Sequence, residues 1–361
     1  MSWLLYGAYG YTGKLILEQV LAEGGERPIL AGRREGPTRE LAEAHGLEWR
    51  QFTLGDDRAR IERGLEGVEA VLHCAGPFSA TSAPMVAACL ARRVHYLDIT
   101  GELGVIEAVL RSSPQAQAAG VALLPGVGFD VVPSDCLAAT LGEALPEAVR
   151  LELAFKSDGS ASRGTTKSMI EGLPEGGCVR KDGKLTRVRP GHRTRVVPFR
   201  RGATRCVAIP WGDVSSAYYS TGIPNITVYM AQPDSVIAGM RVLSLVRPAL
   251  ALSFVQRGLK RLADSVEGPD SAARERCRTQ LWGRVEDRWG DAREAQLEVR
   301  EGYSFTADAA LACLERVLAG AVPPGAWTPS QAFGASFVTE LPDVDLLPPF
   351  RPEPRSEKDR P

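Results

Sequence analysis

Apolar and polar positions follow one repeating pattern through the first third of the chain. Short apolar runs, predicted to be strands, occupy residues 2–6, 28–31, 48–54, 70–75, 95–99 and 121–124. Segments of helical periodicity lie between them at 14–23, 38–45, 57–65 and 83–92. Because the strands are almost continuously apolar and alternate with helices, they predict an α/β domain with a doubly wound parallel sheet covered on both faces.

The pattern changes after about residue 145, where strand-like segments follow one another without a regular helix between them. These segments occupy residues 150–155, 196–199, 207–210 and 226–230. They predict a second, more antiparallel α+β domain for substrate binding and a homodimer contact. We therefore divide the chain into a first domain at 1–135, a second domain at 136–340 and a partly disordered tail at 341–361. A helix at 307–318 is expected to return to the first domain.

A glycine-rich turn joins the first predicted strand to the first predicted helix. Glycines at such a turn let the backbone approach a pyrophosphate, and the amides of the following helix supply the anion site. The spacing GxxGxxG is weak evidence alone, because tight turns also need glycine, but its place between a strand and a helix strengthens it. The predicted cofactor contacts in this turn are Gly7, Tyr9, Gly10, Tyr11, Thr12 and Gly13.

Arg33 and Arg34 follow the second predicted strand, about 20 residues after the glycine turn, where a dinucleotide fold reads the adenosine ribose. An acidic residue there favours NAD, whereas a guanidinium matches a 2′-phosphate through paired hydrogen bonds. NADP(H) is therefore the predicted cofactor. The alternative is that the two arginines are solvated residues at the start of a loop.

Further candidates follow the later strands, since ligands of parallel sheets lie at the carboxyl ends of the strands. We expect a nicotinamide pocket shaped by Ala75, Gly76, Pro77 and Phe78, and cofactor contacts from Asp98 and Thr100. Glu102 is a candidate for substrate binding, or alternatively for the first turn of a helix. Phe129 and Asp130 are further substrate candidates. His73 lies within a strand, and we interpret it as a core residue.

Composition excludes several classes of function. The 361 residues carry 43 basic and 44 acidic side chains, a net charge of −1, which gives no reason to expect a nucleic-acid partner. Seven cysteines without a CxxC pair favour reduced thiols over disulfides, and we expect no metal site. The N-terminus lacks the pattern of a signal peptide, which predicts a cytoplasmic protein.

Residues 235–262 are apolar with helical periodicity, but Arg241, Pro248 and Arg257 interrupt them, so no transmembrane span is predicted. Two interpretations remain open for this segment. It could form helices buried in a core or a dimer contact, or an apolar entrance for a lipid-like substrate or a peripheral membrane surface.

These motifs resemble those of the saccharopine dehydrogenase-like oxidoreductases, in the branch with the trans-acting enoyl reductases and the saccharopine dehydrogenase-like oxidoreductase of animals. The resemblance covers most of residues 1–340, with Ala8-Tyr9 where many relatives have Ala-Thr. It implies a Rossmann domain, NADP(H) and an inserted substrate domain. The motifs that carry it occupy residues 7–13, 31–33, 75–78, 96–102, 128–130, 133–135, 162–165, 210–213 and 220–225.

The resemblance leaves the substrate open, because relatives reduce either imines or carbon–carbon double bonds. We expect an NADPH-dependent oxidoreductase that transfers hydride to a C=C or C=N bond of an apolar small molecule or of a lipid or polyketide. One alternative is a saccharopine-type amino-acid dehydrogenase, which would need arginines that converge on several carboxylates. Another is a nucleotide-sensing or lipid-surface protein without catalysis.

Polar and aromatic residues of the second domain complete the candidates. Since hydride transfer also needs a proton donor, we predict that a tyrosine hydroxyl at Tyr218 or Tyr219 supplies it. The second-domain residues predicted to contact substrate are Arg163, Trp211, Asp213, Thr221 and Asn225.

Overall fold

A computed structural model describes residues 2–159, 162–172, 174, 176–243, 252–262, 265 and 268–352. Within these residues, seven parallel strands form the first sheet, in the order β15-β6-β5-β4-β1-β2-β3. This arrangement confirms the doubly wound parallel sheet. The strands are β1 Trp3–Tyr6, β2 Ile29–Gly32, β3 Trp49–Gln51, β4 Ala70–His73, β5 His95–Asp98, β6 Ala122–Leu124 and β15 Gly325–Ala326.

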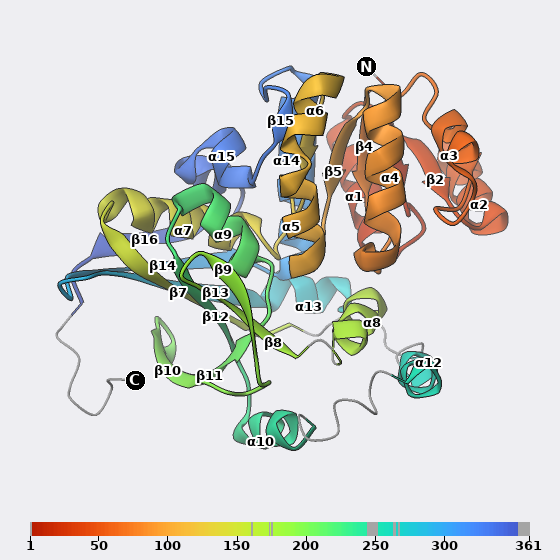
Figure 1. Cartoon of the computed structure of the whole chain (residues 1–361). Helices are drawn as coiled ribbons and strands as arrows, with labels where there is room; N and C mark the ends of the chain where they lie inside the picture. Colours follow the sequence, from red (N-terminus) through yellow and green to blue (C-terminus); the bar gives the residue numbers. More distant parts are fainter. Residues whose placement is uncertain are drawn as a thin grey trace.

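Helices cover both faces of this sheet (Figure 1). In β1, Trp3 and Leu5 pack toward α1 and α14, whereas Leu4 and Tyr6 pack toward the layer of α3 and α4. Both sets of side chains are buried, which explains the continuous apolar run. The helices of this domain are α1 Tyr11–Glu23, α2 Glu35–His45, α3 Arg58–Gly64, α4 Phe78–Arg92, α5 Leu103–Arg111, α6 Ser113–Ala119 and α14 Gly302–Leu318.

The second sheet has the strand order β10-β11-β12-β7-β13-β14-β16, and the hairpin of β8 and β9 joins it at β12. In β13, Leu281 and Val285 face the helix α7 Val132–Ala144, while Trp282 packs on the other face. The strands are β7 Ala148–Ser157, β8 Gly177–Lys181, β9 Lys184–Val188, β10 Thr194–Phe199, β11 Gly202–Ile209, β12 Asn225–Ala231, β13 Arg278–Asp287, β14 Ala292–Arg300 and β16 Asp345–Phe350.

Short helices join these strands: α8 Arg163–Gly172, α9 Asp213–Thr221, α10 Asp234–Leu243, α12 Ser253–Leu262 and α13 Ser271–Arg276. Within the described residues, none of the helices combines the length and apolar character needed to cross a bilayer. The apolar segment at 235–262 contains α10 and α12, and residues 244–251 between them lie outside the description. A homodimer contact there stays a prediction.

The C-terminal part of the chain returns to both sheets. Helix α14 lies against α1, where Gln19 Nε2 donates to Asp308 Oδ1 at 2.8 Å. Strand β15 extends the first sheet beside β6, and β16 pairs antiparallel with β14. The α15 Pro329–Phe333 helix packs on α7, which itself runs across the expected boundary at residue 135. Residues 353–361 of the expected tail lie outside the described residues.

A buried ion pair links the two domains. Arg180 in β8 donates from Nη2 to Glu107 Oε2 of α5 at 2.9 Å, and its side chain is only 3% exposed. Its Nε donates to the Val214 carbonyl, and its guanidinium stacks on the Tyr218 ring at 4.1 Å. Ser215 Oγ also donates to Glu107 at 2.7 Å. The carboxylate is therefore well satisfied although it is removed from water.

Arg180→Ala should lower the free energy of unfolding by about 3 to 5 kcal/mol, because it leaves the Glu107 carboxylate buried without its main partner. The matched control is Arg111→Ala, which removes the exposed arginine that also pairs with Glu107 and should change stability little. Urea denaturation of both variants measures the difference. Equal losses would show that the buried pair does not hold the domains together.

Candidate functional site

The glycine turn after β1 fits the diphosphate of a dinucleotide. Gly7 has φ +89°, and a Cβ there would lie 2.9 Å from Ala75 Cβ. A Cβ on Gly13 would lie 2.5 Å from the Gly7 carbonyl oxygen. Helix α1 begins after Gly10 without a side-chain cap. Its first amides are therefore open to an anion, and the dipole of the helix favours negative charge there.

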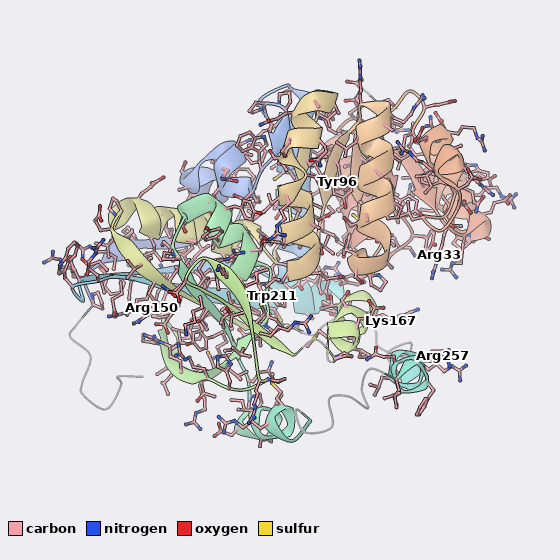
Figure 2. All side chains as sticks on the ribbon, in the orientation of Figure 1. Arg33, Tyr96, Arg150, Lys167, Trp211 and Arg257 are labelled. Atoms are coloured by element: carbon pink, nitrogen blue, oxygen red, sulfur yellow. The ribbon has the colours of Figure 1, made fainter. Side chains whose placement is uncertain are left out.

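Arg33 and Arg34 follow β2 at the same edge of the sheet, and both side chains are exposed (Figure 2). The Tyr9 ring packs directly on Gly32, where a Cβ would lie 2.5 Å from the ring. The Arg34 guanidinium lies 4.8 Å from the centre of the same ring. This arrangement leaves Arg33 free of the stacking contact, at the position where a 2′-phosphate would lie. The role of both arginines stays a prediction.

The loop after β4 contains Ala75, Gly76 and Pro77, and all three are at least partly exposed. Phe78 is buried beneath this loop against the ring of His73. His73 is fully buried, and burial lowers its pKa to about 3. It is therefore a neutral core residue at physiological pH, which agrees with the sequence-based interpretation.

Glu102 has a role that the sequence did not reveal. Its Oε1 accepts a hydrogen bond from the Phe78 amide at 2.8 Å, and its Oε2 accepts one from the Ser79 amide at 2.7 Å. The carboxylate thus caps the N-terminus of α4 from a position remote in sequence. Ser168 of α8 also donates to Oε1 at 3.1 Å. Glu102 lies at the site, but its oxygens are already engaged within the protein.

The predicted cofactor contacts of Asp98 and Thr100 need correction. Both residues are fully buried. Asp98 Oδ1 accepts from the Thr100 and Gly126 amides, and Oδ2 accepts from the Tyr96 hydroxyl at 2.6 Å. Burial raises the pKa of Asp98 to about 6 against these hydrogen bonds. A buried carboxylate needs hydrogen-bond donors from within the protein, and Asp98 obtains them from the loops after β5 and β6. Asp98 therefore fixes the positions of these two loops.

Asp130, at the same edge of the sheet, has a carboxyl group that is not bound by other described side chains or amides. No described residue donates a hydrogen bond to its carboxyl oxygens, although a Cβ on Gly101 would lie 2.6 Å from Oδ2. Burial, and then the negative charge of Glu102, raises the pKa of Asp130 to about 7. Its backbone carbonyl accepts from Trp211 Nε1 at 2.9 Å. Asp130 can therefore hold or release a proton near neutral pH.

Aromatic side chains cluster at the loop that contains Asp130. Phe129 contacts Phe155 and Phe305 edge to face, with ring centres 6.2 and 6.3 Å apart, and Phe155 contacts Trp211 at 4.9 Å. The rings come from four different elements of both domains. They give the carboxyl end of β6 an apolar wall, which suits an apolar substrate better than a polyanionic one.

Tyr303 was missed in the sequence because its role depends on contacts remote in the chain. Its hydroxyl lies 2.8 Å from Thr165 Oγ1, and its ring meets Tyr11 edge to face at 4.9 Å. The Tyr11 hydroxyl donates to the Pro269 carbonyl and accepts from Arg274. The side chain of Tyr11 therefore holds residues 268–276 over the glycine turn, and only its backbone amide remains for the cofactor.

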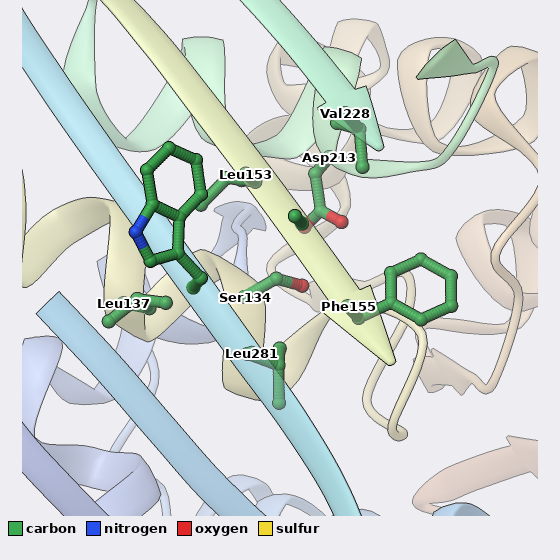
Figure 3. Close-up of a pocket in the computed structure, with 9 residues that line it drawn as sticks. Ser134, Leu137, Leu153, Phe155, Asp213, Val228 and Leu281 are labelled. Carbon is green, nitrogen blue, oxygen red and sulfur yellow. The ribbon is translucent and has the colours of Figure 1, made fainter. Parts of the chain in front are cut away.

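Three of the predicted substrate residues have side chains that the fold uses internally, although Asp213 lies near Phe155 and Asp130. Asp213 is buried, and burial raises its pKa well above the ordinary value. It lines a cavity of about 10 Å³ with Ser134 and Phe155 (Figure 3), which has room for about one water molecule. Thr221 Oγ1 donates to the Ala217 carbonyl in the last turn of α9. The prediction for Asp213 and Thr221 is corrected, since the fold uses both side chains internally.

Asn225 belongs to the opposite end of the second sheet. Its Nδ2 donates to the Val149 carbonyl at 2.9 Å, and its Oδ1 accepts from the Asp182 amide. In the parallel pair of β12 and β7, Asn225 stands opposite Arg150, five residues before Phe155. That separation is roughly 17 Å along a strand. Asn225 therefore does not reach the aromatic pocket, whereas Arg163 is exposed at the start of α8 beside the site.

The predicted proton donors also need correction. Tyr218 stacks on the buried Arg180, and Tyr219 interacts with Arg111, which raises the pKa of that arginine. Arg111 ends α5, whereas the site lies where α5 begins at Leu103. The length of α5 is roughly 13 Å, so Tyr219 lies far from the carboxyl edge. Both tyrosines bind the domains together, a role that residue type alone could not reveal.

Comparisons with known proteins agree with this arrangement. Residues 3–124 match the family model of the saccharopine dehydrogenase NADP binding domain. A Mycobacterium tuberculosis relative is 33% identical over 184 residues, which cover 47% of this chain and 43% of the relative. The trans-acting enoyl reductase of Mycobacterium leprae is 34% identical over 138 residues, which cover 37% of this chain and 33% of that protein. The chain thus spans less than half the length of these relatives.

The fold is shared with a solved structure. Saccharopine dehydrogenase (L-Glu forming) from Saccharomyces cerevisiae superposes with a TM-score of 0.65 over 96% of this chain and 99% of that chain. Sequence identity in this superposition is 12%. The likeness therefore extends to the architecture of both domains and carries no information on the substrate.

Proposed function

We propose that this chain, whose residues 3–124 belong to the saccharopine dehydrogenase NADP-binding domain family, is an NADPH-dependent oxidoreductase that reduces the carbon–carbon double bond of an apolar substrate. One observation carries the proposal: the glycine cradle after β1 and the loop that contains Asp130 and its neighbouring aromatic cluster lie at the same edge of one sheet. The names of the mycobacterial relatives favour an enoyl group over an imine.

When bound, the cofactor supplies a hydride, and the protein supplies position and a proton. Gly7 and Gly13 let the backbone approach the diphosphate, and Arg33 holds the 2′-phosphate. Pro77 bounds the nicotinamide pocket. Asp130 would supply its carboxyl proton to the substrate carbon that does not accept the hydride, and the resulting carboxylate would take up a proton from solvent after the product leaves. Phe129 and Trp211 exclude bulk water and hold the apolar part of the substrate.

The distribution of cations argues against the saccharopine-type alternative. A substrate with several carboxylates needs several unpaired arginines. Four candidates in the second domain are engaged elsewhere, since Arg180, Arg195, Arg200 and Arg201 pair with Glu107, Glu152, Asp345 and Glu298. The engagement of these arginines and the aromatic cluster beside Asp130 therefore favour an apolar substrate. Oxidation of NADPH with a panel of enoyl, enone and imine compounds distinguishes these chemistries from a sensor without catalysis.

Arg33→Ala should weaken NADPH binding by about 10- to 100-fold and leave NADH binding nearly unchanged, because it removes one charge-assisted contact to the 2′-phosphate. The matched control is Arg39→Ala, an exposed arginine of α2 that pairs with Glu35 and Glu43. Fluorescence titration with both nucleotides measures the effect. Equal losses for NADPH and NADH would contradict the assignment of Arg33.

Asp130→Asn should lower kcat by about 10²- to 10⁴-fold, the usual contribution of a general acid. With a pKa of about 7, Asp130 carries its proton below that pH. In the unmodified protein, kcat/KM should therefore fall as the pH rises through about 7, and the variant should lack this dependence. Tyr219→Phe is the control and should keep full turnover. Loss of turnover in Tyr219→Phe but not in Asp130→Asn would reverse the assignment.

The pH dependence of the free energy of unfolding reports the pKa of Asp130 without the need for a substrate. Because the pKa of Asp130 is higher in the folded chain than in the unfolded chain, its ionisation disfavours folding. The free energy of unfolding should fall as the pH rises from about 4 through about 7, and this part of the loss should be absent in Asp130→Asn. Identical pH profiles for both proteins would show that Asp130 titrates normally.

A further inference from the structure

Helices α8 and α12 form a small pair beside the mouth of the site (Figure 1). Gln256 of α12 donates from Nε2 to the Ile170 carbonyl of α8 at 3.1 Å. No residue of α8 is buried, and neither Val255 nor Leu259 of α12 is buried. The pair therefore lies on the surface of the protein and contributes little to its core.

The pair is continuous with the site. Ser168 of α8 donates to Glu102, and the Ser79 hydroxyl in the first turn of α4 donates to Glu171 at 3.2 Å. Thr165 contacts the Tyr303 hydroxyl. A ligand that reaches the nicotinamide pocket from this side must therefore pass α8.

Apolar side chains on this pair are exposed to solvent. Phe254 is 64% exposed, Met169 is 51% exposed and Leu252, just before α12, is 47% exposed. Exposed apolar side chains that cluster on neighbouring helices indicate a surface that binds a protein or a membrane. Trp289, which is 72% exposed, lies in the turn between β13 and β14 and offers a comparison outside this surface.

Positive charge accompanies these apolar groups. Among the described side chains of the two helices, Arg163, Lys167, Arg257 and Arg261 stand against the single acid Glu171, which accepts a hydrogen bond from Ser79. Figure 2 shows Lys167 and Arg257 on the two neighbouring helices. The whole chain has a net charge of only −1, so this concentration of cations is local.

We propose that the α8–α12 pair docks on an anionic lipid surface. A short helix with exposed apolar residues and a cationic polar face is the arrangement that lies in a membrane interface, where cations meet lipid phosphates and apolar side chains enter the acyl boundary. Entry of an apolar substrate from that surface past α8 is the part of the inference that rests on the proposed function. Docking itself does not depend on it.

Vesicle flotation of the full chain tests the proposal. The unmodified protein should float with vesicles of equal parts phosphatidylcholine and phosphatidylglycerol, remain behind with phosphatidylcholine alone, and dissociate in high salt. Phe254→Ser should weaken binding by about tenfold or more, because it removes a buried aromatic group from the interface. The double variant Arg257→Glu, Arg261→Glu should weaken it at least as much, by about fivefold for each unit of charge changed near the surface.

Trp289→Ser is the matched control and should bind like the unmodified protein. NADPH titration of every variant reports whether the nucleotide domain remains folded. Failure of the unmodified protein to float with anionic vesicles would overturn the proposal, as would an equal loss in Trp289→Ser and Phe254→Ser. Reduction of enoyl compounds in solution is measured separately, so docking can fail while the proposed function stands.

Discussion

The close approach of Gly7 to Ala75 is the constraint on which the proposed cofactor site depends. The contact joins the ends of β1 and β4, the neighbouring parallel strands at which the strand order of the first sheet switches from one side to the other. A side chain at Gly7 would separate the two loops and cover the open amides of α1. The proposed placement of the diphosphate at α1, and of the nicotinamide beside the loop after β4, depends on this contact.

The second domain completes the site by holding the loops of the first. Trp211 of the second domain donates from Nε1 to the carbonyl of Asp130. Thr306 of α14 supports the same loop from the first domain, because its Oγ1 accepts from the Phe129 amide and donates to the Gly302 carbonyl. The buried pair of Glu107 and Arg180 maintains this placement at a distance from the site. Burial of the Asp130 carboxyl group, more than the neighbouring charge of Glu102, raises its pKa toward neutrality.

Local pattern explains why the first sheet and its loops were predicted well. Its strands are buried on both faces, so apolar runs mark them, and their ends carry Gly7, Arg33 and Pro77 at the expected edge. Strands β13 and β14 were missed because charged residues alternate along them. Arg284 and Glu294 are buried there as a pair, a contact that periodicity cannot show. The role of Glu102 was misjudged and Tyr303 was missed for the same reason, because hydrogen-bond partners remote in the sequence determine the roles of both residues.

A crystal structure of the protein with bound NADPH tests the central claim most directly. The account predicts the diphosphate at the first turn of α1, the 2′-phosphate against Arg33, and the nicotinamide beside Pro77 with its open face toward the Asp130 carboxyl group. A nicotinamide directed away from Asp130, or an Asp130 side chain engaged by a protein donor in that complex, would contradict the proposed mechanism.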